Sequence, residues 1–449
     1  MRVTFKAIIK LFFVGSIIVA FITGGLIVNG AAKPYAVNLT QKYKGQKIVV
    51  WQGLEETDVM FTVSNRKLMA KNRKTFEEAT GVKIEVVKLQ GETADQRKKT
   101  IAAILAGNGP DIFFFGIGDK IPYIQKKLII PISKYINFSD KDFMAASDLS
   151  PVTHKFMTWG KKVYGIHGPE FSDRLYYNKE LFEINGLEDP LKLYKAGKWN
   201  WDKFLELAKK LTQDTDGNGK VDQYGYQSWL SPQWFLTNNV RWVKYVGKKA
   251  VFNGETENVY YTLQFIYDIV FKHKISPRVW WEPSPQAQFY KGKVAMDYWG
   301  YWEMAEMKKQ MGNKLGIVPF PAGPYLKNKK SADRYQLNVM GISACCKNPA
   351  LAALFIKWLR VPSPAEKAQF EKEMIELYGS KEIWDLIQEM NRNAEVLDCD
   401  AYGRLADIVG TITYIENQTP AQAVQAIKKV AQSAIDEVVG QEMKEELKG

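Results

Sequence analysis

The strongest constraint on the fold is an alternation of short apolar runs with longer amphipathic runs between residues 48 and 115. Short apolar runs are typical of buried strands, whereas the longer runs space their apolar positions as a helix does and end at a glycine. This order predicts a parallel α/β sheet, in which ligands bind beyond the carboxyl ends of the strands. The loops after Trp51 and Phe115 are therefore expected at one edge. Strands are predicted at 48–51, 82–89 and 111–115, and helices at 65–80 and 94–106.

A second informative stretch is 289–302, which contains a short apolar run at 294–296 followed by Asp-Tyr-Trp-Gly-Tyr-Trp. The run predicts a buried strand that ends in exposed rings and a carboxylate. Sugar rings stack on aromatic side chains, and their hydroxyls need acceptors such as a carboxylate. The stretch therefore predicts the floor of a carbohydrate site with Asp297, Trp299 and Trp302. For any single ring, an aromatic corner of the core is the alternative.

Length and charge narrow the function classes. A chain of 449 residues is too long for one small domain and predicts two lobes. Its 46% apolar and 25% charged residues are those of a globular protein. The net charge is +13, but Lys and Arg are scattered and form no basic block with interleaved aromatic residues. We therefore expect no nucleic-acid partner.

The N-terminal segment 1–32 has the order of a secretory signal peptide. Basic residues occur within the first ten positions, residues 11–28 carry no charge, and the small residues 30–32 follow. The apolar run is long for a signal peptide and close to the minimum for a spanning helix, so an uncleaved membrane anchor fits as well. No cysteine lies near its end to carry a lipid. The protein is expected to be secreted or held at the cell surface, outside the cytoplasmic membrane.

Signatures of catalysis are weak in this sequence. It has three histidines, at 154, 167 and 273, and neither a Gly-x-Ser-x-Gly nor a His-Glu-x-x-His motif. Its cysteines, at 345, 346 and 399, match neither a zinc site nor a disulfide framework. We expect a binding protein and not an enzyme. Acids are numerous enough for a glycosidase pair, so an extracellular polysaccharide-degrading enzyme is the alternative.

The segment 214–225 has the ligand spacing of a calcium loop. Oxygen-bearing side chains occur at loop positions 1, 3, 5 and 9, a glycine stands at the sharp-turn position 6, and position 7 can offer its carbonyl. The bidentate glutamate of position 12 is missing, because Gly225 stands there. A turn without metal is the alternative. We expect a structural Ca²⁺ ion with the ligands Asp214, Asp216, Asn218, Lys220 and Asp222.

Several short motifs follow one another in a recognisable order along the chain. They are Lys-Ile-Val-Val-Trp at 47–51, Phe-Glu-Glu-Ala-Thr-Gly at 76–81, Gly-Asn-Gly-Pro-Asp-Ile at 107–112, Tyr-Tyr-Asn-Lys-Glu-Leu-Phe at 176–182, Gly-Lys-Val-Ala-Met at 292–296, Gly-Ile-Val-Pro-Phe-Pro at 316–321 and Asn-Pro-Ala-Leu-Ala at 348–352. The ordered series resembles the extracellular solute-binding proteins of ABC transporters, family 1, the maltose-binding-protein-like group. The similarity spans about residues 45–445, and no single motif carries it.

The resemblance implies an α/β periplasmic-binding-protein type II fold. In that fold two lobes built from discontinuous segments are joined by a hinge, and the ligand lies in the cleft between them. The implied segments are 45–165 and 316–362 for lobe one, and 166–315 and 363–449 for lobe two. Chain crossings are expected near 165–174, 313–316 and 361–365. The segment 419–439 is expected to form an amphipathic helix on lobe two, with the apolar residues Ala421, Val424, Ala426, Ile427, Val430 and Ile435.

By position, the resemblance also implies ligand contacts on both lobes. Lobe one would contribute residues that follow its first and third strands, and an acid would lie by the hinge: Trp51, Glu55, Phe115, Gly116, Asp119 and Glu170. Lobe two would contribute Trp229, Gln233, Trp234, Gly300 and Trp302, the last at the family's stacking position. Ser231 stands where the family often places an acid, so the ligand should differ from maltose.

Together these features predict a monomeric substrate-binding protein that captures a carbohydrate, such as an oligosaccharide, and delivers it to the permease subunits of an ABC importer. Hinge closure would trap the sugar between aromatic platforms and hydrogen-bonding side chains. The alternative on the same fold is a non-sugar solute such as a peptide or a polyamine. A polyamine would need a site lined by acids, not one dominated by tryptophan.

Overall fold

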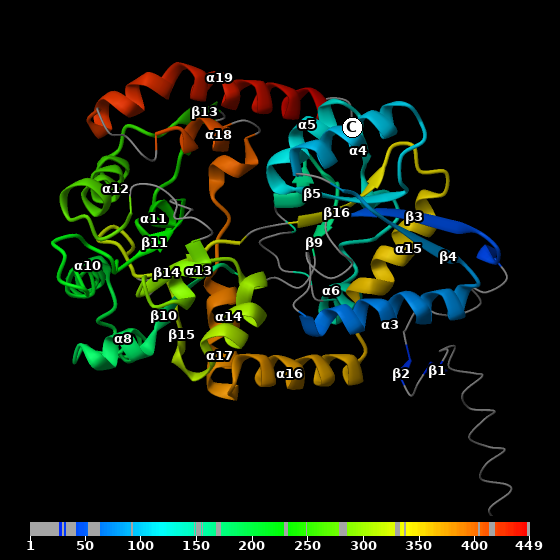
Figure 1. Cartoon of the computed structure of the whole chain (residues 1–449). Helices are drawn as coiled ribbons and strands as arrows, with labels where there is room; N and C mark the ends of the chain where they lie inside the picture. Colours follow the sequence, from blue (N-terminus) through cyan, green and yellow to red (C-terminus); the bar gives the residue numbers. More distant parts are fainter. Residues whose placement is uncertain are drawn as a thin grey trace, which may run out of the picture.

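The computed structural model shows two α/β units, each with its own sheet and hydrophobic core (Figure 1). No helix in the part of the chain that the structure describes is apolar and long enough to cross a membrane. The expected signal or anchor, 1–32, lies outside that part except for the antiparallel pair β1 (Ile27–Val28) and β2 (Ala31–Ala32). The described residues are 27–28, 31–32, 42–52, 63–90, 93–147, 149, 154, 156–167, 172–228, 232–247, 249–277, 285–327, 333–335, 338–402, 405–412 and 418–446.

The first unit is built on a six-stranded sheet. Its strands, in spatial order, are β4 (Lys83–Lys88), β3 (Lys47–Gln52), β5 (Ile112–Gly116), β16 (Asn338–Ser343) and β6 (Ile129–Ile130), and β9 (Ile166–His167) also pairs with β16. β3 is parallel to β4 and β5, whereas β16 is antiparallel to its neighbours. The main helices are α3 (Val63–Thr80), α4 (Thr93–Leu105) and α15 (Pro349–Arg360). The predicted order of strands and helices in 48–115 is confirmed.

Local contacts explain why these segments take this arrangement. Asp111 ends the turn into β5, and its carboxylate accepts a hydrogen bond from the amide of Val49 at 2.8 Å, which joins β5 to β3. Phe76 of α3 packs against Phe355 and Trp358 of α15, with ring centroids 5.0 and 5.6 Å apart. Aromatic packing of this kind buries a large apolar area, so α15 closes the first core although it lies far along the chain.

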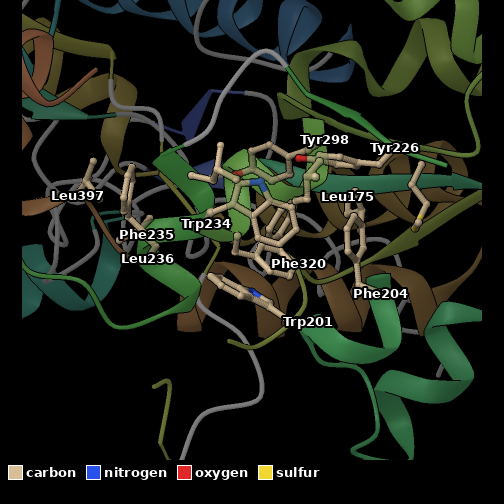
Figure 2. Packing of buried hydrophobic residues seen from close by; sticks show 14 of the residues in the cluster. Leu175, Trp201, Phe204, Tyr226, Trp234, Phe235, Leu236, Tyr298, Phe320 and Leu397 are labelled. Atoms are coloured by element: carbon tan, nitrogen blue, oxygen red, sulfur yellow. The ribbon is translucent and has the colours of Figure 1, made fainter. Parts of the chain in front are cut away.

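The second unit is built on a four-stranded sheet with an aromatic core. Its strands, in spatial order, are β11 (Gln227–Ser228), β14 (Met296–Trp299), β10 (Arg174–Asn178) and β15 (Leu315–Val318). β14 is parallel to β11 and antiparallel to β10, which is antiparallel to β15. The helices α10 (Trp201–Lys210), α11 (Pro232–Thr237) and α12 (Glu257–Tyr267) contribute rings to this core. Figure 2 shows Trp234 among Trp201, Phe204, Tyr226, Tyr298 and Phe320.

Shorter elements connect or cover the two sheets. In the first unit they are η1 (Ile117–Asp119), α5 (Lys120–Gln125), η2 (Ile132–Lys134), α6 (Lys141–Ala146), β7 (Thr158–Trp159) and β8 (Lys162–Val163). In the second unit they are α8 (Lys179–Ile184), α9 (Pro190–Lys195), β12 (Val243–Val246), β13 (Lys249–Phe252), the π-helical η3 (Asp268–Lys272), α13 (Pro285–Tyr290), η4 (Tyr301–Glu303), α14 (Met304–Met311) and η5 (Gly312–Lys314). The C-terminal elements are α16 (Pro364–Tyr378), α17 (Lys381–Asn393), η6 (Asp398–Ala401), α18 (Leu405–Gly410) and α19 (Pro420–Glu446).

Two segments lie on the other side of the expected division between lobes. β9 pairs with β16 in the first sheet, although lobe two was expected to begin at 166. β15 pairs with β10 in the second sheet, although residues from 316 onward were expected in lobe one. Gly316 allows this pairing, because a Cβ there would lie 2.2 Å from the ring of Tyr177 on β10. The crossing expected at 313–316 therefore lies after Phe320, which still belongs to the second core.

Three chain crossings lie side by side and form what we call the hinge strip, residues 172–173, 333–335 and 395. Ser172 bridges Tyr335, and Arg334 bridges Glu395. The amide of Asp173 donates to the carbonyl of Arg334 at 2.8 Å, and the amide of Tyr335 donates to the carbonyl of Glu395 at 3.0 Å. Each crossing is thus hydrogen-bonded to the next, as strands are in a sheet.

Two helices extend across both units (Figure 1). α16 contacts α3 of the first unit as well as α14 and α17 of the second. α19 buries most of its apolar residues in the second core, as expected, but Val438 belongs to the first. Ala421, Ala426 and Val430 were expected on its buried face and are exposed, because the buried stripe follows a helical spacing from Ala423 that leaves them outside it.

The packing of Gly225 explains why the calcium-like loop lacks its twelfth ligand. A Cβ at Gly225 would lie 2.1 Å from the carbonyl oxygen of Ala208 and 2.6 Å from the carbonyl carbon, both in the backbone of α10. The Gly225 amide also donates to the hydroxyl of Thr212 at 3.0 Å. No side chain fits at this position, so a glutamate there is sterically excluded.

We predict that Gly225→Ala destabilises the protein by about 1–3 kcal/mol or more, because the backbone of α10 cannot yield as a flexible side chain would. Thermal unfolding followed by circular dichroism measures the effect. Gly410→Ala is the matched control, since a Cβ at Gly410 meets nothing within 4 Å and the melting temperature should hardly change. A wild-type melting temperature for Gly225→Ala would contradict this close contact.

Candidate functional site

The ends of the central strands in both sheets lie beside the hinge strip. In the first sheet, β5 ends at Gly116, and its partner β16 begins opposite that residue at Asn338, close after the strip residue Tyr335. In the second sheet, β10 begins at Arg174, directly after the strip, opposite Trp299 at the end of β14. η1, which follows β5, contacts η6 of the C-terminal region. The loops after β5 and β14 therefore lie where the two units meet.

The expected contacts on the first unit divide into core and edge residues. Phe115 is 4% exposed, and its ring packs against Phe113 and Tyr123 with centroids 5.7 and 5.5 Å away. Its assignment as a ligand contact is wrong, because alternate residues of β5 share a face and Phe115 shares the core face with Phe113. Trp51 is half-buried at the end of β3 and remains a candidate, as does Gly116. Glu55 and Glu170 lie outside the described residues.

Asp119 is the edge acid of the first unit. It follows β5, its side chain is 14% exposed, and its Oδ2 lies 3.1 Å from a terminal nitrogen of Arg97 on α4. Burial raises the pKa of this carboxyl group, while Arg97 and the backbone amide of Gly116 oppose the rise. Arg97 also forms a hydrogen bond with the hydroxyl of Tyr123. Asp119 and Arg97 thus present an acceptor and donors together.

Two expected contacts on the second unit are core residues instead. Gln233 is fully buried, and its side-chain oxygen accepts a hydrogen bond from the hydroxyl of Tyr298 at 2.6 Å. Trp234 is 2% exposed, and its ring centroid lies 4.5 Å from that of Phe320 and 5.2 Å from that of Trp201. Both residues belong to the short helix α11, and Figure 2 shows Trp234 directed into the aromatic core. Trp229 lies outside the described residues.

Asp297 is buried inside the second sheet and does not lie in an exposed loop. The strand expected at 294–296 instead runs from Met296 to Trp299, so Asp297 sits between Gln227 of β11 and Tyr176 of β10. It is 0% exposed, and neither carboxylate oxygen has a hydrogen-bond partner of good geometry. Burial raises its pKa to about 8, which the nearby Gln227 side chain only partly opposes. A direct sugar contact by Asp297 is therefore wrong for this structure.

Trp302 is the exposed aromatic side chain at the end of the second sheet. It is 36% exposed and packs edge-on against Tyr301, with ring centroids 5.5 Å apart. Its ring also covers Gly300, where a Cβ would lie 2.1 Å from the ring. Trp299 is half-buried at the last position of β14. Of the aromatic stretch, Trp302 thus has the exposure that a stacking platform needs.

Sequence reasoning missed Arg97 and the polar side chains of the hinge strip. The sequence gives only a weak indication of Arg97: the predicted helix 94–106 begins at the same sheet edge as the loop after Phe115. Arg334 and Asp400 form an ion pair at 3.4 Å, and Arg241 pairs with Glu395. No local pattern marks these residues, because each pair joins segments far apart in the chain.

The calcium-like loop is closed by its own hydrogen bonds. The carboxylate of Asp214 accepts the amides of Gly217, Asn218 and Gly219, and the Gly219 amide is the main reason that its pKa is lowered. Asp216 accepts from the side chain of Asn218 at 2.9 Å. These residues and the Lys220 carbonyl fit the ligand order of a calcium loop.

Asp222 is occupied differently from the other expected ligands. Its carboxylate lies 2.6 Å from the ammonium group of Lys293 and accepts hydrogen bonds from the amide and hydroxyl of Thr215. The Lys293 contact, followed by those of Thr215, lowers the pKa of Asp222. Among the described residues, no three His, Cys, Asp or Glu side chains converge as a metal site. Asp222 therefore does not fit a direct ligand role in this arrangement.

Comparison with protein families gives a match over residues 62–366, more than half of the chain, to the bacterial extracellular solute-binding proteins. This agrees with the expectation of a binding protein and not an enzyme. Putative binding proteins of Brucella abortus and Brucella suis are 23% identical over 230 residues, which cover 51% of this chain. The matched region spans about half of these relatives, 53% of their length.

Solved structures with the same fold include several sugar-bound proteins. An ABC substrate-binding protein of Listeria monocytogenes in complex with cycloalternan matches with a TM-score of 0.64 and 16% identity, over 88% of this chain and 99% of its own. The galacto-N-biose/lacto-N-biose I-binding protein of Bifidobacterium longum matches with a TM-score of 0.63 and 17% identity, over 88% of this chain and 97% of its own. The maltotriose-binding protein of Thermus thermophilus matches with a TM-score of 0.60 and 20% identity, over 86% of this chain and 100% of its own. The fold class expected from the sequence is confirmed.

We predict that Asp297→Asn removes part of the pH dependence of stability. Because folding raises the pKa of Asp297 from 3.8 to about 8, its contribution is fully present below pH 4. That contribution is lost as the pH rises from about 4 to 8, at up to about 1.4 kcal/mol per pH unit. A neutral amide has no such loss, so the variant should gain melting temperature relative to wild type at pH 8 but not at pH 4.

Differential scanning calorimetry at both pH values tests this. Glu371→Gln, a change of an exposed acid on α16, is the control and should show the same difference from wild type at both pH values. If Asp297→Asn is destabilised equally at pH 4 and pH 8, the carboxyl group does not change its protonation on folding.

Proposed function

The chain belongs to the bacterial extracellular solute-binding proteins, and on that basis we propose that it captures a carbohydrate outside the cytoplasmic membrane and delivers it to the permease of an ABC importer. The observation that carries the choice of a carbohydrate is the exposed ring of Trp302 at the sheet edge beside the hinge strip. The sugars bound by proteins of the same fold support this choice. An oligosaccharide fits best, because the loops after β5 and β14 offer contacts from both units.

Binding would combine stacking with hydrogen bonding between the two units. The apolar face of a sugar ring would lie on Trp302, while Asp119 and its neighbours hydrogen-bond the hydroxyls from the first unit. Rotation about the hinge strip would bring the two sets of contacts together around the ligand. We propose that a monomer in this closed form is what the permease recognises.

A polyamine ligand is less well supported by the charges at this edge. Asp119 is paired with Arg97, and Asp400 is paired with Arg334. A polycation needs several uncompensated carboxylates, whereas a neutral, hydroxylated ligand does not. The paired acids therefore favour a sugar over a polyamine.

We also propose that the loop 214–222 binds a structural Ca²⁺ ion through Asp214, Asp216, Asn218 and the Lys220 carbonyl, with Asp222 supporting the loop through Thr215 and Lys293. We predict that EDTA lowers the melting temperature of the wild type but not that of Asp216→Ala, since the ion would stabilise only the folded loop. Added Ca²⁺ should restore the wild type. An unchanged melting curve in both proteins would mean that the loop's own hydrogen bonds hold it without metal.

The carbohydrate proposal is tested by Trp302→Ala. The best sugar is first chosen by thermal shift from maltotriose, lacto-N-biose, cycloalternan and tagatose, since a ligand that binds only the folded form raises its melting temperature. We predict that the variant binds it at least about tenfold more weakly by calorimetric titration, a cost on the order of 2 kcal/mol or more. Its melting temperature without sugar should stay near that of the wild type.

Two further variants separate a platform from a core residue. Trp201→Ala removes a fully buried ring and should cost about 3–5 kcal/mol of folding stability. Tyr135→Ala removes a ring that is 42% exposed in the first unit and should change neither binding nor melting. Normal sugar affinity in a badly destabilised Trp302→Ala protein would show that the ring belongs to the core.

A further inference from the structure

Arg97 lies at the edge of the first sheet where the ligand is proposed to bind. It is in the second turn of α4, and this helix starts right after the loop that follows β4. Two side chains of α4 hold its start against that loop: Gln96 donates to the carbonyl of Leu89 and Lys99 to that of Gln90, both at 3.4 Å. The first turns of α4 are therefore held at the carboxyl end of β4, next to the loop after β5.

Protein contacts hold the Arg97 side chain in position but do not engage all of its hydrogen-bond donors. It is 47% exposed, it pairs with Asp119 at 3.1 Å, and it forms a hydrogen bond with Tyr123 beneath. A guanidinium group has five N–H donors, so these two contacts do not use all of them. Asp119 likewise has a second carboxylate oxygen, and its position is set by the Arg97 pair and the Gly116 amide.

The pair faces the second unit. η1, which ends at Asp119, contacts η6 across the junction. Burial raises the pKa of Asp119, while the Arg97 side chain and the Gly116 amide oppose that rise. The negative charge of Asp407 on α18 adds to the rise. η1, with Asp119 at its end, thus lies against the second unit, where a ligand held between two lobes would be in reach.

We propose that Arg97 is a further ligand-binding residue, and that Arg97 and Asp119 together bind two neighbouring hydroxyl groups of the sugar; this rests on the proposed function. One hydroxyl oxygen accepts from the guanidinium, and the other hydroxyl donates to the carboxylate. The arginine and the acid neutralise each other, so the pair selects uncharged, hydroxyl-rich ligands over amines and acids. It thereby adds a polar contact from the first unit to the stacking ring of Trp302 on the second.

Calorimetric titration with the best of maltotriose, lacto-N-biose, cycloalternan and tagatose tests this. Arg97→Met removes the donors but keeps the apolar stem, and it should weaken binding at least tenfold. Arg97→Lys keeps the charge without the planar donor geometry, so its sugar affinity should lie between those of wild type and Arg97→Met. Lys98→Met is the matched control, because Lys98 is the next residue of the same helix, its side chain is 80% exposed, and it pairs with Asp95 of the same helix. The sugar affinity of this variant should match that of wild type.

Stability measurements separate ligand binding from a structural role. Because Arg97→Met leaves Asp119 without its partner, Arg97→Met/Asp119→Asn is included to remove the remaining charge. Weak binding with a near-normal melting temperature in the double variant supports the proposal. Normal affinity in Arg97→Met, or weak binding only in proportion to lost stability, overturns it. If wild type binds none of the four sugars, the carbohydrate function fails and this inference fails with it.

Discussion

The structure depends most on the backbone hydrogen bonds of the hinge strip. Three segments that are distant in the chain cross between the units there, and each is bonded to the next by backbone groups. Because those bonds use the same donors and acceptors as a sheet, the crossings must bend together and cannot bend independently. The side chain of Asn391 adds a bond to the amide of Ser172 at 3.0 Å. The strip thus joins the two units and lies beside the ends of their central strands.

The use of tryptophan in the second unit follows from what each ring can contact. Trp201 and Trp234 lie inside the core, where rings from several helices enclose them, and the indole nitrogen of Trp201 donates to the hydroxyl of Thr237 at 3.3 Å. Trp302 lies three residues beyond the end of β14 and is 36% exposed. Most of these aromatic residues therefore build the core. The candidate platform is distinguished from them by its exposure near the end of a strand.

Two acids that the sequence marks alike have opposite environments. Asp297 lies within a strand buried on both faces, where burial favours the neutral acid. Asp119 lies just after a strand, where it is reachable by solvent and paired with Arg97. Asp297 lies two positions before the end of β14, whereas Asp119 lies three positions after the end of β5. The position relative to the end of the strand thus decides between a buried acid and one that can contact a ligand.

The sequence by itself determined the elements whose signals are local: the alternation of strands and helices in 48–115 and the helix near the C-terminus. It also carried the ordered motifs that indicate the family. Only the tertiary structure decided which sheet β9 and β15 join and where β14 ends. Met296, Asp297 and Tyr298 are all buried, so their strand has no polar and apolar alternation to reveal its faces. The same limit applies to Phe115, Gln233 and Trp234, because the face that a side chain takes depends on partners brought from elsewhere in the chain.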